Sequence, residues 1–216
     1  MFLMSRSKDI NVSTSRFANV AFSDGSLLYG FSKRIEKRQP LAAPNDIKRY
    51  FLTPEESGEL CLLSCIFGEN KDIFFPKLNK EKDLLSFSDL AIKYLRERGY
   101  EAFICKSEDE ARELIKILPE KKKWPCLFTE SNTTGEKEVE EFYTDQDVLN
   151  MDRFMSLGVI KNVTNYDEEK LKNFEKVIKK LKLSKSWDKK TIVNEFLKLI
   201  PNFKYYDKNN YLDGKM

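Results

Sequence analysis

Hydrophobic positions along the chain alternate between two spacings. Short apolar runs bounded by polar or turn residues have the pattern of buried β-strands, and they cover 12–17, 71–78, 100–105 and 124–129. Apolar residues at helical spacing on one face lie between these runs, over 26–37, 53–67, 86–99 and 108–118. Strands that alternate with helices favour parallel pairing with right-handed crossovers, so the pattern predicts an α/β fold.

The helix expected to begin at Thr53 has both of its ends marked in the sequence. Thr53 has the position of an N-cap, Pro54 the first helical position, and Glu56 stands three residues after the cap. Gly68 is expected to end the helix. Cys61 and Cys65 lie one turn apart on it, and we expect them to belong to its core-facing side.

Other stretches are assigned by weaker signals. Pro40 and Pro44 predict an irregular segment over 39–48. Met1–Asp9 has the pattern of a helix end, with apolar residues followed by basic ones. From Asp145 onward the chain is expected to be helical and polar, with an apolar stripe over 167–183.

Lysines are concentrated in this last third. Between Lys170 and Lys190 there are nine lysines and only two acidic residues, Glu175 and Asp188. A solvated helix face is the simpler interpretation, and a nucleic-acid surface the alternative. The lysines are not interleaved with aromatic residues as a single-strand binder requires, so we expect no nucleic-acid partner.

Composition excludes several classes of protein. The formal net charge of +3 indicates neither nucleic acid nor membrane as a partner, and no apolar run approaches the ~18 residues of a membrane span. The chain has no histidine, which removes the commonest general base and any Cys/His zinc site. Its four cysteines form no CxxC pair and are expected to be reduced, mostly buried thiols in a cytoplasmic protein. We therefore expect no metal ion.

The stretch from Thr14 to Phe51 holds the candidate ligand-binding residues. Asn19 would follow a short strand, and Gly25-Ser26 would open the next helix, whose free N–H groups favour an anion. Arg49 offers a planar fork suited to a phosphate. The alternative is a tight turn with surface polar residues.

Five segments together resemble a known family: Arg16-Phe17-Ala18-Asn19-Val20, Gly25-Ser26, Arg49-Tyr50-Phe51, Phe74-Phe75-Pro76-Lys77 and Gly135-Glu136-Lys137. In this order they are similar to the carboxyl-terminal part of nucleotide-sugar 4,6-dehydratases of the extended short-chain dehydrogenase/reductase superfamily. Among these, the chain is most similar to the polysaccharide-biosynthesis type that acts on UDP- or GDP-linked N-acetylglucosamine, and to the dehydratase of legionaminic acid synthesis. That enzyme shares the long tail after the Gly-Glu-Lys motif.

The resemblance implies a reaction in which a tightly held NAD(P) takes hydride from the sugar C4, water leaves across C5 and C6, and hydride returns to C6. The family uses a glycine-rich dinucleotide loop and a Tyr-x-x-x-Lys pair. None of the eight glycines here forms such a loop. Tyr166 and Lys170 have the spacing of the pair, but they lie in the polar tail. We therefore expect no catalytic residue and no cofactor on this chain alone, and NAD(P) only in the complete enzyme.

Site residues follow from the resemblance one by one. Asn19 matches a residue that hydrogen-bonds the substrate, Ser26 one whose loop approaches the nucleotide, Arg49 an arginine that reaches the diphosphate or base, and Glu136 a carboxylate that accepts from ribose hydroxyls. Arg16 is interpreted as structural, tying the end of its strand.

The chain departs from the family before the Gly-Glu-Lys motif. Thr133-Thr134 replaces an Arg-Pro pair, which removes a cation that would contact the nucleotide.

The resulting prediction is the carboxyl-terminal part of a Rossmann-like protein, comprising its last sheet strands, a small substrate domain and a helical tail. Residues 1–80 would be the remnant of the Rossmann-like core, 81–144 a small α/β substrate subdomain and 145–216 the lysine-rich tail. The expected partners are a nucleotide sugar and a separately encoded NAD-binding half. The alternatives are a non-catalytic remnant of a truncated gene, and a binding module for a nucleotide sugar or an acidic partner.

Overall fold

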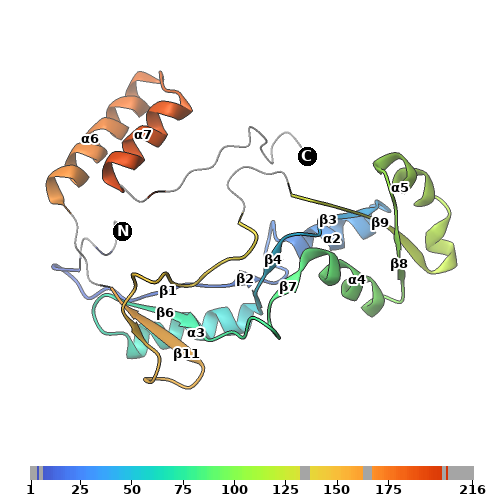
Figure 1. Cartoon of the computed structure of the whole chain (residues 1–216), viewed down its shortest axis with the longest axis horizontal. Coiled ribbons are helices and arrows are strands. Elements are labelled where there is room, and N and C mark those ends of the chain that lie inside the picture. Colours follow the sequence, from blue (N-terminus) through green and yellow to red (C-terminus); the bar gives the residue numbers. More distant parts are fainter. Residues whose placement is uncertain (1–3, 5–6, 132–136, 163–166, 201–202, 204–216) are drawn as a thin grey trace. The chain divides into compact units, whose positions relative to one another are not determined.

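The computed structural model describes residues 4, 7–131, 137–162, 167–200 and 203, which belong to two compact units (Figure 1). The first, here called the α/β unit, comprises Arg6–Ser131 and Glu136–Asn162. The second, the hairpin unit, comprises Val163–Met216 with Met1–Ser5 and Asn132–Gly135. The three-part division at 1–80, 81–144 and 145–216 stays a prediction. The helix end expected over Met1–Asp9 falls largely outside the described residues.

Helices and short strands alternate along the described part of the α/β unit, as the sequence predicted. Its helices are α2 (Leu27–Glu36), α3 (Pro54–Phe67), α4 (Phe87–Glu97), α5 (Glu108–Leu114) and the 3₁₀ turn η1 (Leu118–Lys121). Its strands are β1 (Thr14–Ser15), β2 (Asn19–Val20), β3 (Leu41–Pro44), β4 (Lys48–Arg49), β5 (Phe51–Leu52), β6 (Asp72–Pro76), β7 (Leu85–Ser86), β8 (Glu101–Ile104), β9 (Lys123–Thr129), β10 (Leu149–Asn150) and β11 (Leu157–Lys161).

Parallel pairing is confirmed for most of these strands. β1 pairs with β6, β2 with β5, and both β3 and β8 with β9, all in parallel. The antiparallel pairs are β4 with β7, β6 with β11 and β10 with β11. The two larger sheets have the orders β3-β9-β8 and β1-β6-β11-β10.

The sheet β3-β9-β8 packs against α2 and α4 (Figure 1). Phe31 of α2 and Leu95 of α4 are fully buried with Leu41 of β3 and Cys126 of β9, in a cluster that extends to Trp124. Ser26 is the N-cap of α2 and Ser86 the N-cap of α4, where the sequence predicted the two helices to begin. The side chain of each serine accepts a hydrogen bond from an N–H of the first turn. Within the described part of the unit this cluster holds eleven buried residues, against three in each of two other clusters, and burial of a side chain the size of Phe31 contributes about 1.5–3 kcal/mol. It is therefore the main core of the unit.

The sheet β1-β6-β11-β10 packs against α3. The capping box is confirmed: the Thr53 hydroxyl accepts from Glu56 N–H at 3.1 Å, and the Glu56 carboxylate accepts from Thr53 N–H at 2.7 Å. Gly68 ends the helix, as the sequence predicted, and its N–H donates to Ser64 O at 3.0 Å. A Cβ at Gly68 would overlap Ser64 O and the Ser13 side chain, so close approach explains this glycine.

Strand β6 is buried at all five of its positions, and it makes two special contacts with β11 and with the segment just before it. The carboxylate of Asp72 is fully buried, with Arg153 Nη1 and Lys161 Nζ each 2.8 Å from one of its oxygens. Gly158 of β11 lies opposite Phe75, and a Cβ at Gly158 would overlap the Phe75 ring. A buried ion pair and a close backbone approach therefore fix the register of these two strands.

Two predictions of secondary structure are wrong. The segment 39–48 is not irregular throughout, since Leu41–Pro44 is strand β3, with Pro44 at its last position where its missing N–H does least harm. Among the described residues from Asp145 onward the first helix begins only at Glu168, and Leu157–Lys161 is instead a strand buried against β6.

The expectation of mostly buried thiols holds for two of the four cysteines. Cys105 and Cys126 are buried, whereas Cys61 and Cys65 are exposed on α3. The correction follows from the way α3 packs, since Leu60 and Ser64 face the sheet and the cysteines lie on the outer side.

The described part of the hairpin unit is a pair of helices that lie side by side, α6 (Glu168–Ser184) and α7 (Lys189–Leu199) (Figure 1). Asp167 caps α6 and Asp188 caps α7. The rings of Phe174 and Phe196 meet edge to face between the helices, with centroids 5.1 Å apart. None of the described helices is long and apolar enough to cross a membrane.

Candidate functional site

Two arginines position the segment Lys137–Tyr143, here called the wall segment. Arg16, just after β1, donates from Nη1 to the carbonyl oxygen of Phe142. Arg49 of β4 donates from Nη1 to the carbonyl oxygen of Glu138 at 3.2 Å, and Lys48 N–H donates to the same oxygen at 2.9 Å. Arg16 and Arg49 therefore hold the wall segment near its two ends, at Phe142 and Glu138. Both arginines belong to the motifs described in the sequence.

Arg49 is buried, with 6% of the residue exposed. Besides Glu138 it donates to Lys48 O at 2.8 Å, its Nε lies 3.6 Å from the Glu140 carboxylate, and its guanidinium lies over the Phe87 ring at 5.8 Å. These contacts give Arg49 a positioning role beneath the wall segment. Its expected contact with a diphosphate stays a prediction.

Asn19 lies beside Arg49 through strand pairing. Its N–H donates to Tyr50 O at 3.0 Å, and β2 sets it in register with Phe51. The sequence placed Asn19 just after a strand, whereas it begins the two-residue strand β2. Its side chain is half-buried, and within the described part of the chain it has no hydrogen-bond partner. This amide is therefore available to a ligand.

Ser26 has a clear local role. Its Oγ accepts from Tyr29 N–H at 3.3 Å as the N-cap of α2, and its own N–H donates to Ser23 O at 2.9 Å. Gly25 before it has φ +76°, a conformation that glycine adopts without strain. The approach of this loop to a nucleotide stays a prediction.

The fourth predicted site residue, Glu136, lies outside the described residues, as do Thr133-Thr134 and Tyr166. Of the Gly-Glu-Lys motif the structure describes only Lys137.

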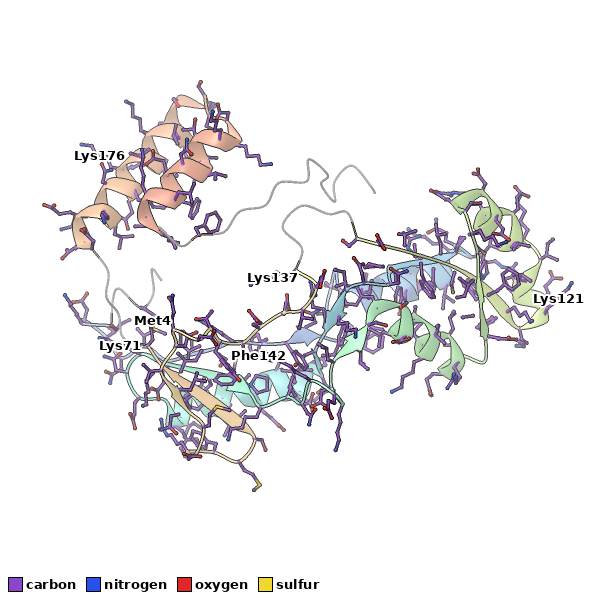
Figure 2. All side chains as sticks on the ribbon, viewed as in Figure 1. Met4, Lys71, Lys121, Lys137, Phe142 and Lys176 are labelled. Carbon is purple, nitrogen blue, oxygen red and sulfur yellow. The ribbon has the colours of Figure 1, made fainter. Side chains whose placement is uncertain are left out.

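Two cavities adjoin the wall segment. One has a volume of about 440 Å³ and lies toward the end of β6, where it is lined by Tyr50, Phe75, Pro76, Lys77, Leu78, Asn79, Lys80, Glu140, Glu141, Phe142, Tyr143, Asp145 and Met151. The other has a volume of about 380 Å³ and is lined by Arg16, Phe17, Lys137, Glu140, Glu141 and Phe142. Since Glu140–Phe142 line both, the wall segment separates two adjoining hollows. Figure 2 shows Lys137 and Phe142 along this segment.

Aromatic rings form much of the larger cavity. Phe142 stacks on Phe75 with an interplanar angle of 17°, and its ring centroid lies 5.5 Å from that of Tyr50. Burial raises the pKa of Tyr50, and the charge of Asp83 and the Tyr143 phenol raise it further. The Tyr50 hydroxyl therefore stays protonated at neutral pH and can donate a hydrogen bond.

Lys77 lies at the edge of this cavity and anchors a loop. Its Nζ donates to the carbonyl oxygens of Met151 and, at 2.6 Å, of Phe154. A lysine that follows a buried strand ending in proline is thus used to hold the chain that leads into β11.

Sequence reasoning placed the site at Asn19, Ser26 and Arg49, and none of these lines either cavity. Arg16 lines the smaller one, although it was interpreted only as a tie at the strand end, which it also is. Lys77 and Lys137 also line the cavities, and both belong to sequence motifs on which the family resemblance rests. Those motifs could have pointed to these two residues as part of the site.

The described residues contain no ligand cluster for a metal ion, and the turn before α2 forms no cradle for a dinucleotide. They contain no group of three acidic or cysteine side chains able to hold a metal ion. The turn before α2 has a single glycine, and the hydroxyl of Ser26 already caps the helix, so the glycine-rich cradle of a dinucleotide is missing from this turn.

Comparisons with known proteins identify the family and the fold. A family model described as "Polysaccharide biosynthesis protein" matches residues 2–161. No curated protein sequence matches the chain. Among solved structures, the X-ray structure of Pen from Bacillus thuringiensis aligns with a TM-score of 0.54 at 17% sequence identity, over 80% of this chain and 53% of that one.

At this identity the structural match shows the fold alone. The mixed α/β architecture is consistent with a partial Rossmann-like domain, and the chain spans about half the length of the solved structure.

Proposed function

Because the chain belongs to the polysaccharide biosynthesis protein family, we propose that it is the substrate-binding portion of a nucleotide-sugar 4,6-dehydratase. Its substrate would be a nucleoside diphosphate linked to N-acetylglucosamine, in a cytoplasmic pathway of polysaccharide or nonulosonic acid synthesis. The family membership supports the pathway, and the geometry around the wall segment supports the ligand.

One observation carries the proposal: two motif arginines hold the wall segment between two adjoining cavities of about 440 and 380 Å³. Both volumes lie in the range of small-molecule clefts, which are ~300–1,000 Å³. A nucleotide sugar has two bulky ends joined by a charged diphosphate, so it suits two hollows divided by a ridge. Rigid anchoring of the ridge lowers the entropy cost of binding.

The lining suggests which part of the ligand each region would meet. Arg16 and Lys137 in the smaller cavity supply cations for a diphosphate. Tyr50, Phe75 and Phe142 in the larger one supply apolar faces for a base or a sugar ring. Asn19, with its free amide, and Glu136 would add hydrogen bonds to the sugar and the ribose. Arg49 would act through the wall segment.

The chemistry would need a second set of residues. NAD(P), when bound to a complete enzyme, would supply hydride removal and return, but the turn before α2 in this chain lacks the glycine-rich cradle for it. We propose that a separately encoded or adjoining NAD-binding half provides the cofactor and the Tyr-x-x-x-Lys pair. Two open surfaces support such a partner: β1 is an edge strand of its described sheet, and the outer face of α3 exposes Leu62, Ile66 and Phe67.

Titration calorimetry tests the ligand. UDP-N-acetylglucosamine and its GDP counterpart are titrated into the chain, with NAD as a third ligand expected not to bind at micromolar concentration.

Lys137→Ala is expected to weaken binding of the preferred nucleotide sugar by about 1.5–3 kcal/mol, as for a charged hydrogen bond. Lys121→Ala removes the same charge from η1, away from both cavities, and is expected to change little (Figure 2). Equal losses in the two variants would contradict a site at the wall segment, and stoichiometric NAD binding would contradict the assignment to the substrate half.

Size-exclusion chromatography tests the partner. The chain alone is expected to aggregate or associate, and to elute as a defined complex when a Rossmann half ending in Tyr-x-x-x-Lys is co-expressed. The complex is then assayed for the 4-keto sugar. A sharp, cooperatively unfolding monomer that ignores the added half would favour an independent binding module, and a complex without activity would favour a remnant.

A further inference from the structure

The hairpin unit has a groove that the site in the α/β unit does not use. Its volume is about 530 Å³, and it is lined by Ile178, Leu181, Lys182, Lys185, Trp187 and Ile192. These residues come from the end of α6, the connection after it and the start of α7. Four of the six are apolar and two are lysines.

The connection that forms the groove is fixed at both ends. Lys185 ends α6 in the left-handed conformation with φ 52°, which turns the chain sharply. Asp188 then caps α7, accepting from Thr191 N–H at 2.7 Å. Trp187 stands between these two caps with 59% of its surface exposed, so the groove is preformed with an uncovered aromatic side.

Apolar side chains of the hairpin are incompletely covered elsewhere as well. In the described parts of α6 and α7 the only buried residue is Glu195. Two helices with no fully buried apolar side chain have little core of their own. A further apolar surface against the groove would therefore stabilise the pair.

The charge of the hairpin unit near the groove indicates what kind of partner surface would pack there. Residues 179–190 contain six lysines and one acidic residue, Asp188. A second copy of this end would bring like charges together, which opposes self-association. An acidic partner would be attracted and oriented by the same field.

We propose that this groove binds an acidic amphipathic helix of a protein partner, with apolar anchors seated on Ile178, Leu181, Trp187 and Ile192 and acidic residues facing Lys182 and Lys185. This interaction goes beyond the proposed nucleotide-sugar function and does not depend on it. Helices laid in apolar grooves use anchors at i, i+3 or i+4, and i+7, and they suit a concave surface. A bilayer would instead meet a convex apolar face, and single-stranded nucleic acid would require several stacking rings.

Fluorescence of the full-length chain tests the proposal. The probe is a synthetic amphipathic helical peptide with leucine anchors and glutamate on its polar positions. A matched peptide has glutamine in place of glutamate, and phosphatidylcholine vesicles with and without phosphatidylglycerol form the third arm. Burial of Trp187 by the acidic peptide should shift its emission to shorter wavelength. The shift should be absent in Trp187→Phe, since the second tryptophan, Trp124, is already 2% exposed.

Charge reversal separates the groove from the general basic surface. The double variant Lys182→Glu with Lys185→Glu should weaken the acidic peptide by about tenfold or more. The matched control, Lys176→Glu with Lys180→Glu, makes the same change in charge outside the groove, and is expected to weaken it less than about threefold. Figure 2 shows Lys176 projecting from α6 away from α7.

Three outcomes would overturn the proposal. The first is no emission shift with the acidic peptide. The second is an equal loss in the two double variants, which would indicate diffuse electrostatic attraction. The third is a shift caused by phosphatidylglycerol vesicles in place of the peptide, which would indicate a lipid surface.

Discussion

The helices on the two larger sheets of the α/β unit differ in how many of their apolar side chains are buried. On the sheet β3-β9-β8, helices α2 and α4 bury Leu28, Phe31 and Leu95. On the sheet β1-β6-β11-β10, helix α3 buries Leu60 but exposes Leu62 and Ile66 to about 60% each. The first pair of helices is amphipathic, whereas α3 is apolar on both sides in its second half.

The difference shows which helices have their apolar side chains buried within this unit and which do not. A helix that is apolar all round is normally buried all round, so α3 has the sequence of a helix that is covered on its outer side. The core under α2 and α4 needs no further cover. Phe17 and Phe22 are further exposed apolar residues of this unit, and β1 is an edge strand of its described sheet, which supports the proposed NAD-binding half as a partner.

Thiol labelling should give the largest contrast between the two regions. Cys105, directly after β8, and Cys126, in β9, are buried, and burial raises the pKa of Cys126 to about 12. Cys61 and Cys65 are exposed on α3. A disulfide reagent should modify the α3 pair at least ~1,000-fold faster, because the buried pair reacts only after opening. Mass spectrometry identifies the modified residues, with Cys61→Ser/Cys65→Ser as the control. Rapid labelling of Cys126 would show that the first core is also open.

Core truncation should give the next largest contrast. Phe31→Ala is expected to lower the free energy of unfolding by ~3–5 kcal/mol, since it leaves a cavity in a closed cluster. Leu62→Ala on the outer face of α3 is expected to change it by less than ~0.5 kcal/mol. Urea unfolding followed by circular dichroism measures both. A large loss in Leu62→Ala would mean that its face is already covered.

Arg49 connects the covered region to the candidate site, because its guanidinium lies over Phe87 of α4 and holds Glu138 of the wall segment. Arg49→Ala should weaken nucleotide-sugar binding by ~1.5–3 kcal/mol, because the wall segment loses the charged hydrogen bond that holds Glu138 in place. Lys179→Ala on α6 should change it little. Titration calorimetry measures both, and Arg49→Lys shows whether the charge or the planar fork is needed. Equal effects of Arg49→Ala and Lys179→Ala would indicate diffuse electrostatic binding.

The smallest effect concerns the start of α3. Thr53→Ala removes one side of the capping box and is expected to cost about 1 kcal/mol of stability. Thr53→Ser keeps the hydroxyl and is the matched control. Thermal unfolding compares the two, and equal losses would show that the methyl group, not the cap, is what matters.

Local signals predicted the elements well where cap and periodicity agreed. The helices that begin after Ser26, Thr53, Ser86 and Ser107 are all confirmed, because a serine or threonine there satisfies the first-turn N–H groups without help from the rest of the fold. Strand β3 was missed because its short Leu-Ala-Ala run is stabilised by pairing with β9, far along the chain. The same holds for β11 and its pairing with β6.

The candidate site was less predictable for the same reason. Motifs indicated Arg16 and Arg49, but not that both would hold one segment about ninety or more residues further along the chain. Such contacts depend on chain closure over long separations, which no local pattern contains. The outer face of α3 was misjudged because helical periodicity shows which residues share a face, and not whether anything covers it.

Gly158 does not line the larger cavity, but its close approach to Phe75 lets the residue at this position set the width of the cavity. Phe75 fills the space that a side chain at position 158 would need, and its ring stacks on Phe142 in the cavity wall. Any larger residue at 158 would push this ring toward the hollow and narrow it. Ligand preference would therefore differ between related proteins through one position of the neighbouring strand that does not line the cavity, while every residue that touches the ligand stayed the same.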